Sequence, residues 1–173
     1  QTWSIRSADV VIASSAKVHP QAIVVPDGIP AVLQQSVTKK YDVVYSGGLG
    51  KQKGTDVLLD ALKIIRQQRP INVLMITPQQ PVPYEQLLPV LAQAKVGIEP
   101  KPLQSTEGSG KLLNYLAAGI QPVTLDPQDP TAAGLAANIV KALAGHGNTY
   151  PATYWKDNAA ILKQVYDTAL HQS

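Results

Sequence analysis

Two glycine-rich segments of this 173-residue chain carry the residue types that bind phosphate groups. The first, residues 46–50 (SGGLG), offers backbone N–H groups that can approach an anion closely, and Lys53 follows it. The second, residues 105–111 (STEGSGK), gathers hydroxyl groups, glycines and Lys111 at the expected start of a helix. Hydroxyls, helix-terminal N–H groups and an ammonium all favour negative charge. The two segments therefore predict an anion site.

Each segment also has a purely structural interpretation. Residues 46–50 complete neither the P-loop pattern GxxxxGK[ST] nor the dinucleotide pattern GxGxxG, so they could form only a tight strand-to-helix turn. In residues 105–111, a Ser or Thr could cap the helix while Lys111 stays solvated. A lysine in a first helical turn opposes the helix dipole, however, which favours the anion-binding interpretation for the second segment.

Residues 77–84 form a third candidate segment, in which an aromatic side chain and exposed backbone groups could hold a flat base. Packing is an equally good explanation of its tyrosine. The three histidines, His19, His146 and His171, lie far apart in the sequence and are expected at the surface. No Ser-His-Asp set, HExxH motif or paired-carboxylate motif can be assembled, so neither hydrolytic chemistry nor a metal site is predicted.

Alternating strands and helices must position these segments. Apolar runs predict strands at 8–14, 22–25, 42–46, 72–77, 96–98 and 122–125. Helical spacing predicts helices at 84–94, 111–118, 132–143 and 155–170, and another from Thr55, the expected N-cap, to Pro70. The strand centres are continuously apolar, which is typical of a parallel sheet covered by helices on both faces. The predicted class is α/β with a doubly wound sheet, whose ligands bind beyond the carboxyl ends of the strands.

Composition excludes several classes of protein. The chain is 45% hydrophobic and 16% charged with a net charge of +3, so it is not expected to be disordered. It has no cysteine and therefore no disulfide scaffold. Its Lys and Arg residues are scattered, which disfavours nucleic acid as a partner. No apolar run reaches the roughly 18 residues of a membrane span.

In order along the chain, these segments resemble the C-terminal nucleotide-sugar-binding domain of GT-B glycosyltransferases, the retaining family 4 type. Residues 45–59 resemble the strand, loop and helix usually written S-G-R-L-x-x-x-K-G. Residues 83–100 resemble P-Y-E-E-L-x-x-x-L-x-x-A-D-V-G-I-x-P, and residues 111–123 resemble K-L-x-E-Y-L-A-A-G-K-P-V-V. Residues 7–15, 25–29 and 155–166 resemble the last acceptor-domain strand, the interdomain V-P-N-G-I and the closing helix.

The resemblance implies a Rossmann-like half of a GT-B fold and a role for each matching residue. The donor diphosphate would be bound by Gly47, Gly48, Lys53, Ser109 and Lys111. The ribose and base would be bound by Asn114, Thr77, Val82 and Tyr84, and Glu107 would be the catalytic glutamate that contacts the sugar. The nucleotide diphosphate-sugar is a substrate, so no cofactor and no metal are implied. Gly48 and Asn114 stand where the family usually has arginine and glutamate.

The resemblance also implies a domain organisation and partners. Residues 1–40 would hold the last acceptor-domain strand and the linker, 41–145 the donor-binding domain, and 146–173 the closing C-terminal helix. A sugar or glycolipid acceptor would bind a missing N-terminal domain, so this chain alone is expected to be inactive. The enzyme would be cytoplasmic, with any peripheral association with the inner face of the membrane supplied by that domain. Two alternatives stay open: a non-catalytic nucleotide- or partner-binding module, and a flavodoxin-like regulatory domain.

Overall fold

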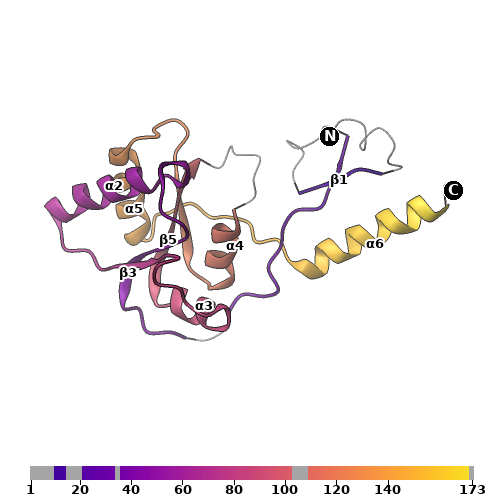
Figure 1. Ribbon diagram of the computed structural model, residues 1–173, viewed down its shortest axis with the longest axis horizontal. Coiled ribbons are helices and arrows are strands. Elements are labelled where there is room, and N and C mark those ends of the chain that lie inside the picture. Colours follow the sequence, from indigo (N-terminus) through magenta and orange to yellow (C-terminus); the bar gives the residue numbers. More distant parts are fainter. Residues whose placement is uncertain (1–9, 15–20, 34–35, 103–108, 172–173) are drawn as a thin grey trace. The chain divides into compact units, whose positions relative to one another are not determined.

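The computed structural model describes residues 10–14, 21–33, 36–102 and 109–171 (Figure 1). The chain divides into two compact units. One unit contains the described residues of 1–31 and 152–173, and the other contains those of 32–105 and 109–151. The second unit holds the main sheet and every candidate site residue that the structure describes.

A four-stranded parallel sheet forms the centre of the second unit, in the order β4-β3-β5-β6. The strands are β3 (Tyr41–Ser46), β4 (Val73–Ile76), β5 (Ala94–Pro102) and β6 (Gln121–Leu125). Val44 of β3 pairs with Leu74 on one side and with Gly97 on the other. The predicted α/β, doubly wound, Rossmann-like architecture is confirmed.

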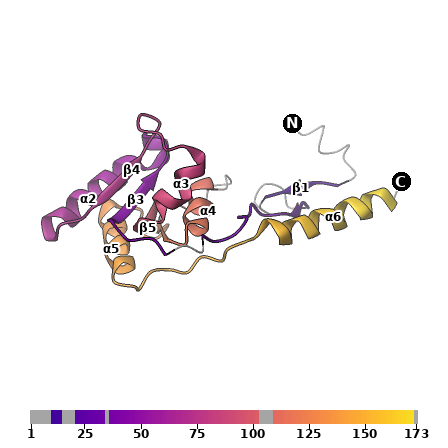
Figure 2. The same ribbon diagram turned by 90° about the horizontal axis from the view of Figure 1, so that it is seen from below.

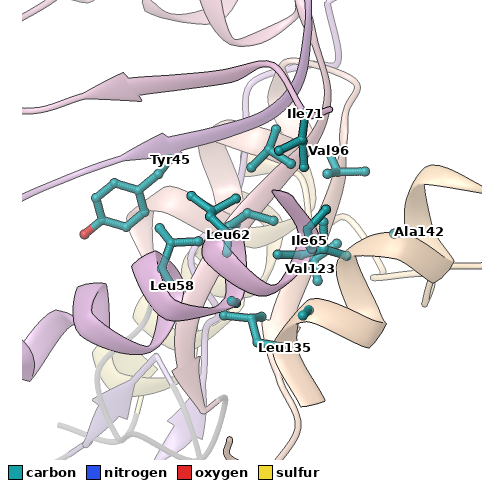
Figure 3. Close-up of a cluster of buried hydrophobic side chains, with 14 of the residues drawn as sticks. Tyr45, Leu58, Leu62, Ile65, Ile71, Val96, Val123, Leu135 and Ala142 are labelled. Carbon is teal, nitrogen blue, oxygen red and sulfur yellow. The ribbon is translucent and has the colours of Figure 1, made fainter. Parts of the chain in front are cut away.

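Helices α2 (Thr55–Gln68) and α5 (Ala132–Leu143) contact each other and cover one face of the sheet (Figures 1 and 2). Figure 3 shows the aliphatic cluster between these helices and the strands, with Tyr45 at its margin. Its fully buried members include Val43, Leu58, Val96, Ile98, Leu135 and Ile139. Both helices follow the bounds expected from the sequence closely, because their apolar residues recur at helical spacing.

Helices α3 (Tyr84–Leu91) and α4 (Gly110–Ala117) cover the opposite face (Figure 2). Val44, Leu91 and Tyr115 are buried between them and the sheet. Successive β3 residues therefore point to opposite faces, and both faces are buried. This arrangement is the reason that the strand centres are apolar without alternation.

Three local predictions were wrong. Thr55 does not cap α2: Gly54 is the N-cap, and the Thr55 hydroxyl instead bonds the N–H and C=O of Gly50, both at 2.7 Å. The predicted helix 84–94 ends at Leu91, because Ala94 already pairs with Tyr41 as the first residue of β5. β5 also continues to Pro102, beyond the strand expected at 96–98, since its later residues still pair with β6.

The predicted linker between Pro30 and Lys40 has neither helix nor strand in its described residues, and from residue 32 onward they belong to the second unit. Leu33 donates a backbone hydrogen bond to Ala117 O at 2.7 Å, and Val37 packs against the α3–α4 face. The Lys39 ammonium donates to Ala92 O and Ala94 O, both at 2.9 Å. These contacts hold Leu33, Val37 and Lys39 within that unit, and the expected role of the segment as a linker between domains stays a prediction.

The first unit contains the short parallel strands β1 (Ile12–Ala13) and β2 (Ile23–Val24) and helix α6 (Trp155–His171). The strand expected over 8–14 is described only from residue 10, and Ile12 is exposed rather than buried. α6 is tied to the N-terminal segment by a bridge between Ile29 and Tyr154 and by the Asn158 amide, which donates to Pro26 O. The predicted domain boundaries at residues 40 and 145 stay a prediction.

Candidate functional site

The candidate site lies where the strand order reverses. From β3 the chain moves to β4 on one side and returns to β5 on the other, so the carboxyl ends of β3 and β5 diverge. In doubly wound sheets this is the place where ligands bind. Gly47 and Gly48 follow β3, Glu99 lies near the end of β5, and Ser109 precedes α4.

Tyr115 of α4 connects the two diverging strands. Its hydroxyl accepts a hydrogen bond from Ser46 N at 3.0 Å and donates one to Ile98 O at 3.1 Å. The ring reaches this position because Gly97 has no side chain: a Cβ there would lie 2.6 Å from Tyr115 Cδ1. Burial raises the pKa of the fully buried Tyr115 hydroxyl, so it stays protonated. Gly97 and Tyr115 thus fix α4 against the sheet beside the site.

A buried carboxylate lies beside the predicted anion-binding lysine. Glu99 is 2% exposed, and its Oε2 accepts a hydrogen bond from Ser109 Oγ. Its Oε1 lies 3.2 Å from Lys111 Nζ, and the Lys111 side chain is 16% exposed. The lysine approaches this oxygen without hydrogen-bond geometry, so Glu99 Oε1 accepts no hydrogen bond from the described part of the chain. The contact is an ion pair in a largely water-excluded position.

The Lys111 side chain also contacts the loop after β3. Its ammonium lies 5.1 Å from the centroid of the Tyr45 ring, which is a cation–π distance. A Cβ on Gly47 would lie 3.2 Å from Lys111 Cδ, and the φ of Gly47 is +147°. Both the contact and the dihedral favour glycine at this position. The Tyr45 hydroxyl donates to Gly48 O at 2.6 Å and so holds the same loop.

The tyrosine beside the lysine is shielded from ionisation. Burial raises the pKa of Tyr45, and the nearby charge of Glu99 raises it further. Besides the two tyrosines, the ionisable groups of this cluster among the described residues are the carboxyl of Glu99 and the amino group of Lys111, one acidic and one basic. Ser109 completes the cluster as the N-cap of α4, accepting a hydrogen bond from Leu112 N at 3.3 Å.

The Glu99 ion pair changes how the position of Lys111 is interpreted. A cation in the first turn of α4 opposes the helix dipole, and the sequence alone suggested an absent anion as the compensating group. The structure supplies a resident anion, Glu99. Compensation by this carboxylate explains the placement of Lys111 without a ligand, although part of the Lys111 side chain remains exposed.

The structure brings together three of the predicted diphosphate-binding residues, Gly47, Ser109 and Lys111. Lys111 contacts Gly47, and both Ser109 and Lys111 contact Glu99. Gly48 adjoins them in the loop after β3, with open space around the position of a Cβ. Lys53 lies farther along, in the 3₁₀ helix η1 (Lys51–Lys53), with no side-chain bond to a described residue.

The residues predicted to bind ribose and base do not contact this cluster within the described ranges. Thr77, Val82 and Tyr84 follow β4, which lies on the side of β3 away from β5. Tyr84 is 83% exposed, Thr77 pairs with Gln80, and Val82 packs against the α3–α4 face. Asn114 is half-buried on α4, three residues after Lys111. The proposed catalytic residue Glu107 lies outside the described residues.

Sequence reasoning missed Glu99 as a functional residue. A glutamate directly after a continuously apolar run, two residues beyond Gly97, was the available signal. A residue at the carboxyl end of a buried strand points toward the ligand edge or into a helix-covered face. Its partner could not be read from the sequence, because Ser109 and Lys111 are brought to it by the turn into α4.

The described residues contain neither a cluster of metal-binding side chains nor a helix that could span a membrane. Among them no group of three or more His, Cys, Asp or Glu side chains is placed to hold a metal ion, and His146 is exposed as predicted. His19 lies outside the described ranges. No helix of the described part of the chain has the length and apolar character needed to cross a membrane.

Comparison with known proteins adds no family: no protein-family model matches the sequence, and no curated protein matches it.

Proposed function

We propose that this chain is the donor-binding domain of a glycosyltransferase that holds the diphosphate of a nucleotide-sugar at the junction of β3 and β5. The single observation that carries the proposal is the meeting of Gly47, Ser109 and Lys111 at the carboxyl edge where the strand order reverses. A diphosphate needs backbone N–H groups, a helix N-terminus and a cation, and these residues offer all three. The motif resemblance supports the same assignment.

In the proposed reaction, the oxygen of an acceptor hydroxyl forms a bond to the anomeric carbon of the sugar, while the bond from that carbon to the diphosphate breaks. The proton of the acceptor hydroxyl passes to the departing diphosphate. Negative charge then develops on the departing diphosphate. Lys111 and the N-terminal end of α4 would stabilise that charge more strongly in the transition state than in the ground state. Lys53 would add a second cation from the longer loop after β3. An acceptor domain would have to position the acceptor and exclude water.

Calorimetric titration of the chain with UDP, GDP and ADP tests the binding step. We expect at least one of these nucleotides to bind, and Lys111→Ala to weaken that binding about 10- to 100-fold, since a charge-assisted contact contributes roughly 1.5–3 kcal/mol. Lys53→Ala should weaken binding less, because the Lys53 side chain on the glycine-flanked helix η1 has no described partner and loses more conformational entropy when it binds. Lys163→Ala serves as the control, because Lys163 pairs only with the exposed Asp167 on α6 among described residues.

Three results would contradict the proposal. These are no binding of any of the three nucleotides, parent-like binding by Lys111→Ala, and equal losses in the Lys111 and Lys163 variants. The chain alone is also expected to transfer no sugar from any donor to any acceptor. Turnover by these 173 residues would show that a second domain is not needed.

A non-catalytic binding module is the second candidate, and the Glu99–Lys111 pair is the observation that favours it. A lysine already neutralised by a buried carboxylate suits a structural role better than a free phosphate-binding cation does. Gly48 and Asn114, which stand where the resembled family has arginine and glutamate, point the same way. Activity in a two-domain protein that contains this chain would exclude this candidate.

A further inference from the structure

The cation that the proposed function needs for the diphosphate is already paired. Lys111 Nζ lies 3.2 Å from Glu99 Oε1, and 97% of the Glu99 side-chain surface is buried. An incoming phosphate would compete with this carboxylate for one ammonium. The carboxylate therefore bears directly on any anion bound at this site.

We propose that Glu99 is a positioning residue that holds Lys111 in a closed ion pair, and that a phosphate group binds only by drawing the Lys111 ammonium away from Glu99. On this proposal Glu99, rather than the number of cations, sets how tightly the site holds a diphosphate. The inference rests on the proposed function, because it names the residue that regulates affinity at the same site. It goes beyond that function in assigning an inhibitory role to a carboxylate.

The structure identifies Lys111 as the partner that moves. Glu99 is part of β5, is almost fully buried, and is held by the Ser109 hydroxyl. Lys111 sits in the first turn of α4 on a flexible stem, with 16% of its side chain exposed. The stem and the ammonium already lie beside Gly47, with Cδ 3.2 Å and Nζ 3.5 Å from the position of a Cβ there, so a small rotation of the outer carbons would take the ammonium off Glu99 while it stays beside the loop after β3. That loop is where the predicted diphosphate would lie.

The departure of Lys111 would leave Glu99 with few polar partners. Ser109 would still donate to Oε2, while the hydroxyls of Tyr45 and Tyr115 are committed to Gly48 O and Ile98 O. A buried carboxylate without its counter-ion is unfavourable, and this cost would be subtracted from the affinity of any anion that captures Lys111. Removing the negative charge of Glu99 removes that cost.

A double-mutant cycle on the whole chain tests the inference, with inorganic pyrophosphate and UDP as probes. We expect Glu99→Gln to bind the probes at least tenfold more tightly than the parent does, because Lys111 is released while the amide can still accept from Ser109. Glu85→Gln is the matched control, since Glu85 is exposed in the first turn of α3. In a Lys111→Met background, Glu99→Gln should change affinity by less than twofold.

The cycle separates the two proposals. If the parent binds a probe and Glu99→Gln binds it equally, the inference fails while the proposed function stands. If Glu99→Gln still improves affinity tenfold in the Lys111→Met background, Glu99 repels the anion directly and the ion-pair mechanism is wrong. If neither the parent nor Glu99→Gln binds pyrophosphate, UDP, GDP or ADP, both proposals fall.

A measurement on the unsubstituted protein covers the case in which Glu99→Gln fails to fold. The ¹⁵N signal of the Lys111 ammonium can be assigned by its loss in Lys111→Met. Saturation with pyrophosphate should shift that signal, and Lys163 should not respond. Pyrophosphate binding that leaves the Lys111 signal unchanged would overturn the inference.

Discussion

The two ends of the sheet each carry a lysine–carboxylate pair, and the pairs differ in burial. At the amino end, Lys95 Nζ lies 2.7 Å from Asp42 Oδ1, with the two side chains 50% and 14% exposed. At the carboxyl end, Lys111 Nζ lies 3.2 Å from Glu99 Oε1, with the side chains 16% and 3% exposed. The shorter pair is the more solvated one. We therefore expect burial, rather than distance, to decide which pair contributes more to the stability of the fold.

The carboxylates also differ in their other partners. Asp42 accepts a backbone hydrogen bond from Asn72 N at 2.9 Å, so it keeps a strong donor if its lysine is lost. Glu99 has one described hydrogen-bond donor, Ser109, for its two oxygens. A site that binds ligands needs groups with unused bonding capacity, whereas a structural pair does not. This contrast favours the carboxyl end as the candidate ligand site.

The largest expected effect comes from the close packing behind the carboxyl-end pair. Gly97→Ala would place a Cβ 2.6 Å from Tyr115 Cδ1, inside contact distance of a ring that two hydrogen bonds fix in place. We expect the free energy of unfolding to fall by roughly 3 kcal/mol, the upper range for overpacking a core. Urea denaturation followed by circular dichroism measures it.

Gly48→Ala is the matched control, because no atom lies within 4 Å of the position of its Cβ. Its free energy of unfolding should stay within about 0.5 kcal/mol of the parent value, as for an ordinary surface substitution. Equal losses in the two variants would mean that the end of β5 is no more tightly packed than the loop after β3.

The second prediction sets Lys111→Met against Lys53→Met. Lys111→Met leaves the buried Glu99 without its counter-ion, so we expect a loss of about 2–3 kcal/mol, discounted from the value for a fully buried pair because Lys111 is partly exposed. Lys53 has no described partner, and its replacement should cost less than about 0.5 kcal/mol. Urea denaturation without ligand measures the free energy of unfolding of both variants. An unchanged value in Lys111→Met would show that the ion pair does not stabilise the fold.

The sequence predicted the architecture well because the fold depends on local patterns. Helices α2 and α5 and the strand centres follow from the spacing of apolar residues alone. Errors occurred where tertiary pairing extends or shortens an element. β5 begins at Ala94 and ends at Pro102 because β3 and β6 form backbone pairs with it along that length. The residue types at 94–102 do not indicate which strands will pair with them.

The candidate site was predicted in its glycines and lysine but not in its electrostatics. Gly47 and Lys111 stand out in the sequence as residue types that suit an anion. Glu99 lies 12 positions before Lys111, and its carboxylate reaches the ammonium only because β5 and α4 meet across Gly97. Charge pairing between separate elements depends on tertiary geometry, which spacing in one sequence does not encode.

The third prediction concerns the tyrosine that joins β3 to β5. Tyr115→Phe leaves Ser46 N and Ile98 O without the hydroxyl that bonds both, and we expect a loss of about 1–2 kcal/mol. Tyr45→Phe removes one bond, to a loop carbonyl that water can reach more easily, and should cost about 1 kcal/mol or less. If Tyr45→Phe costs more, the loop after β3 depends on that bond more than the junction depends on Tyr115.

The same tyrosine makes stability depend on alkaline pH. Burial raises the pKa of Tyr115 in the folded chain. The Tyr115 hydroxyl therefore ionises at about pH 10 in the unfolded chain, while it stays protonated in the folded chain. The stability is therefore fully present below about pH 10 and falls as the pH rises above it. Tyr115→Phe should lose stability less steeply than the parent over that alkaline range. Urea midpoints measured across it provide the comparison.

The smallest expected effect returns to the amino-end pair. Lys95→Met should lower the free energy of unfolding by less than about 1 kcal/mol, although its ion pair is the shorter one, because Lys95 is half-exposed. Burial alone would raise the pKa of Asp42, but the hydrogen bond from Asn72 and the charge of Lys95 together lower it. Asp42 therefore adds stability above about pH 4 that is lost as the pH falls below that value, and the difference between parent and Lys95→Met should disappear there. Urea denaturation of the parent and of Lys95→Met at neutral and at acid pH measures the loss and its pH dependence. A loss in Lys95→Met as large as that in Lys111→Met would mean that the distance within an ion pair affects the stability of this protein more than its burial does.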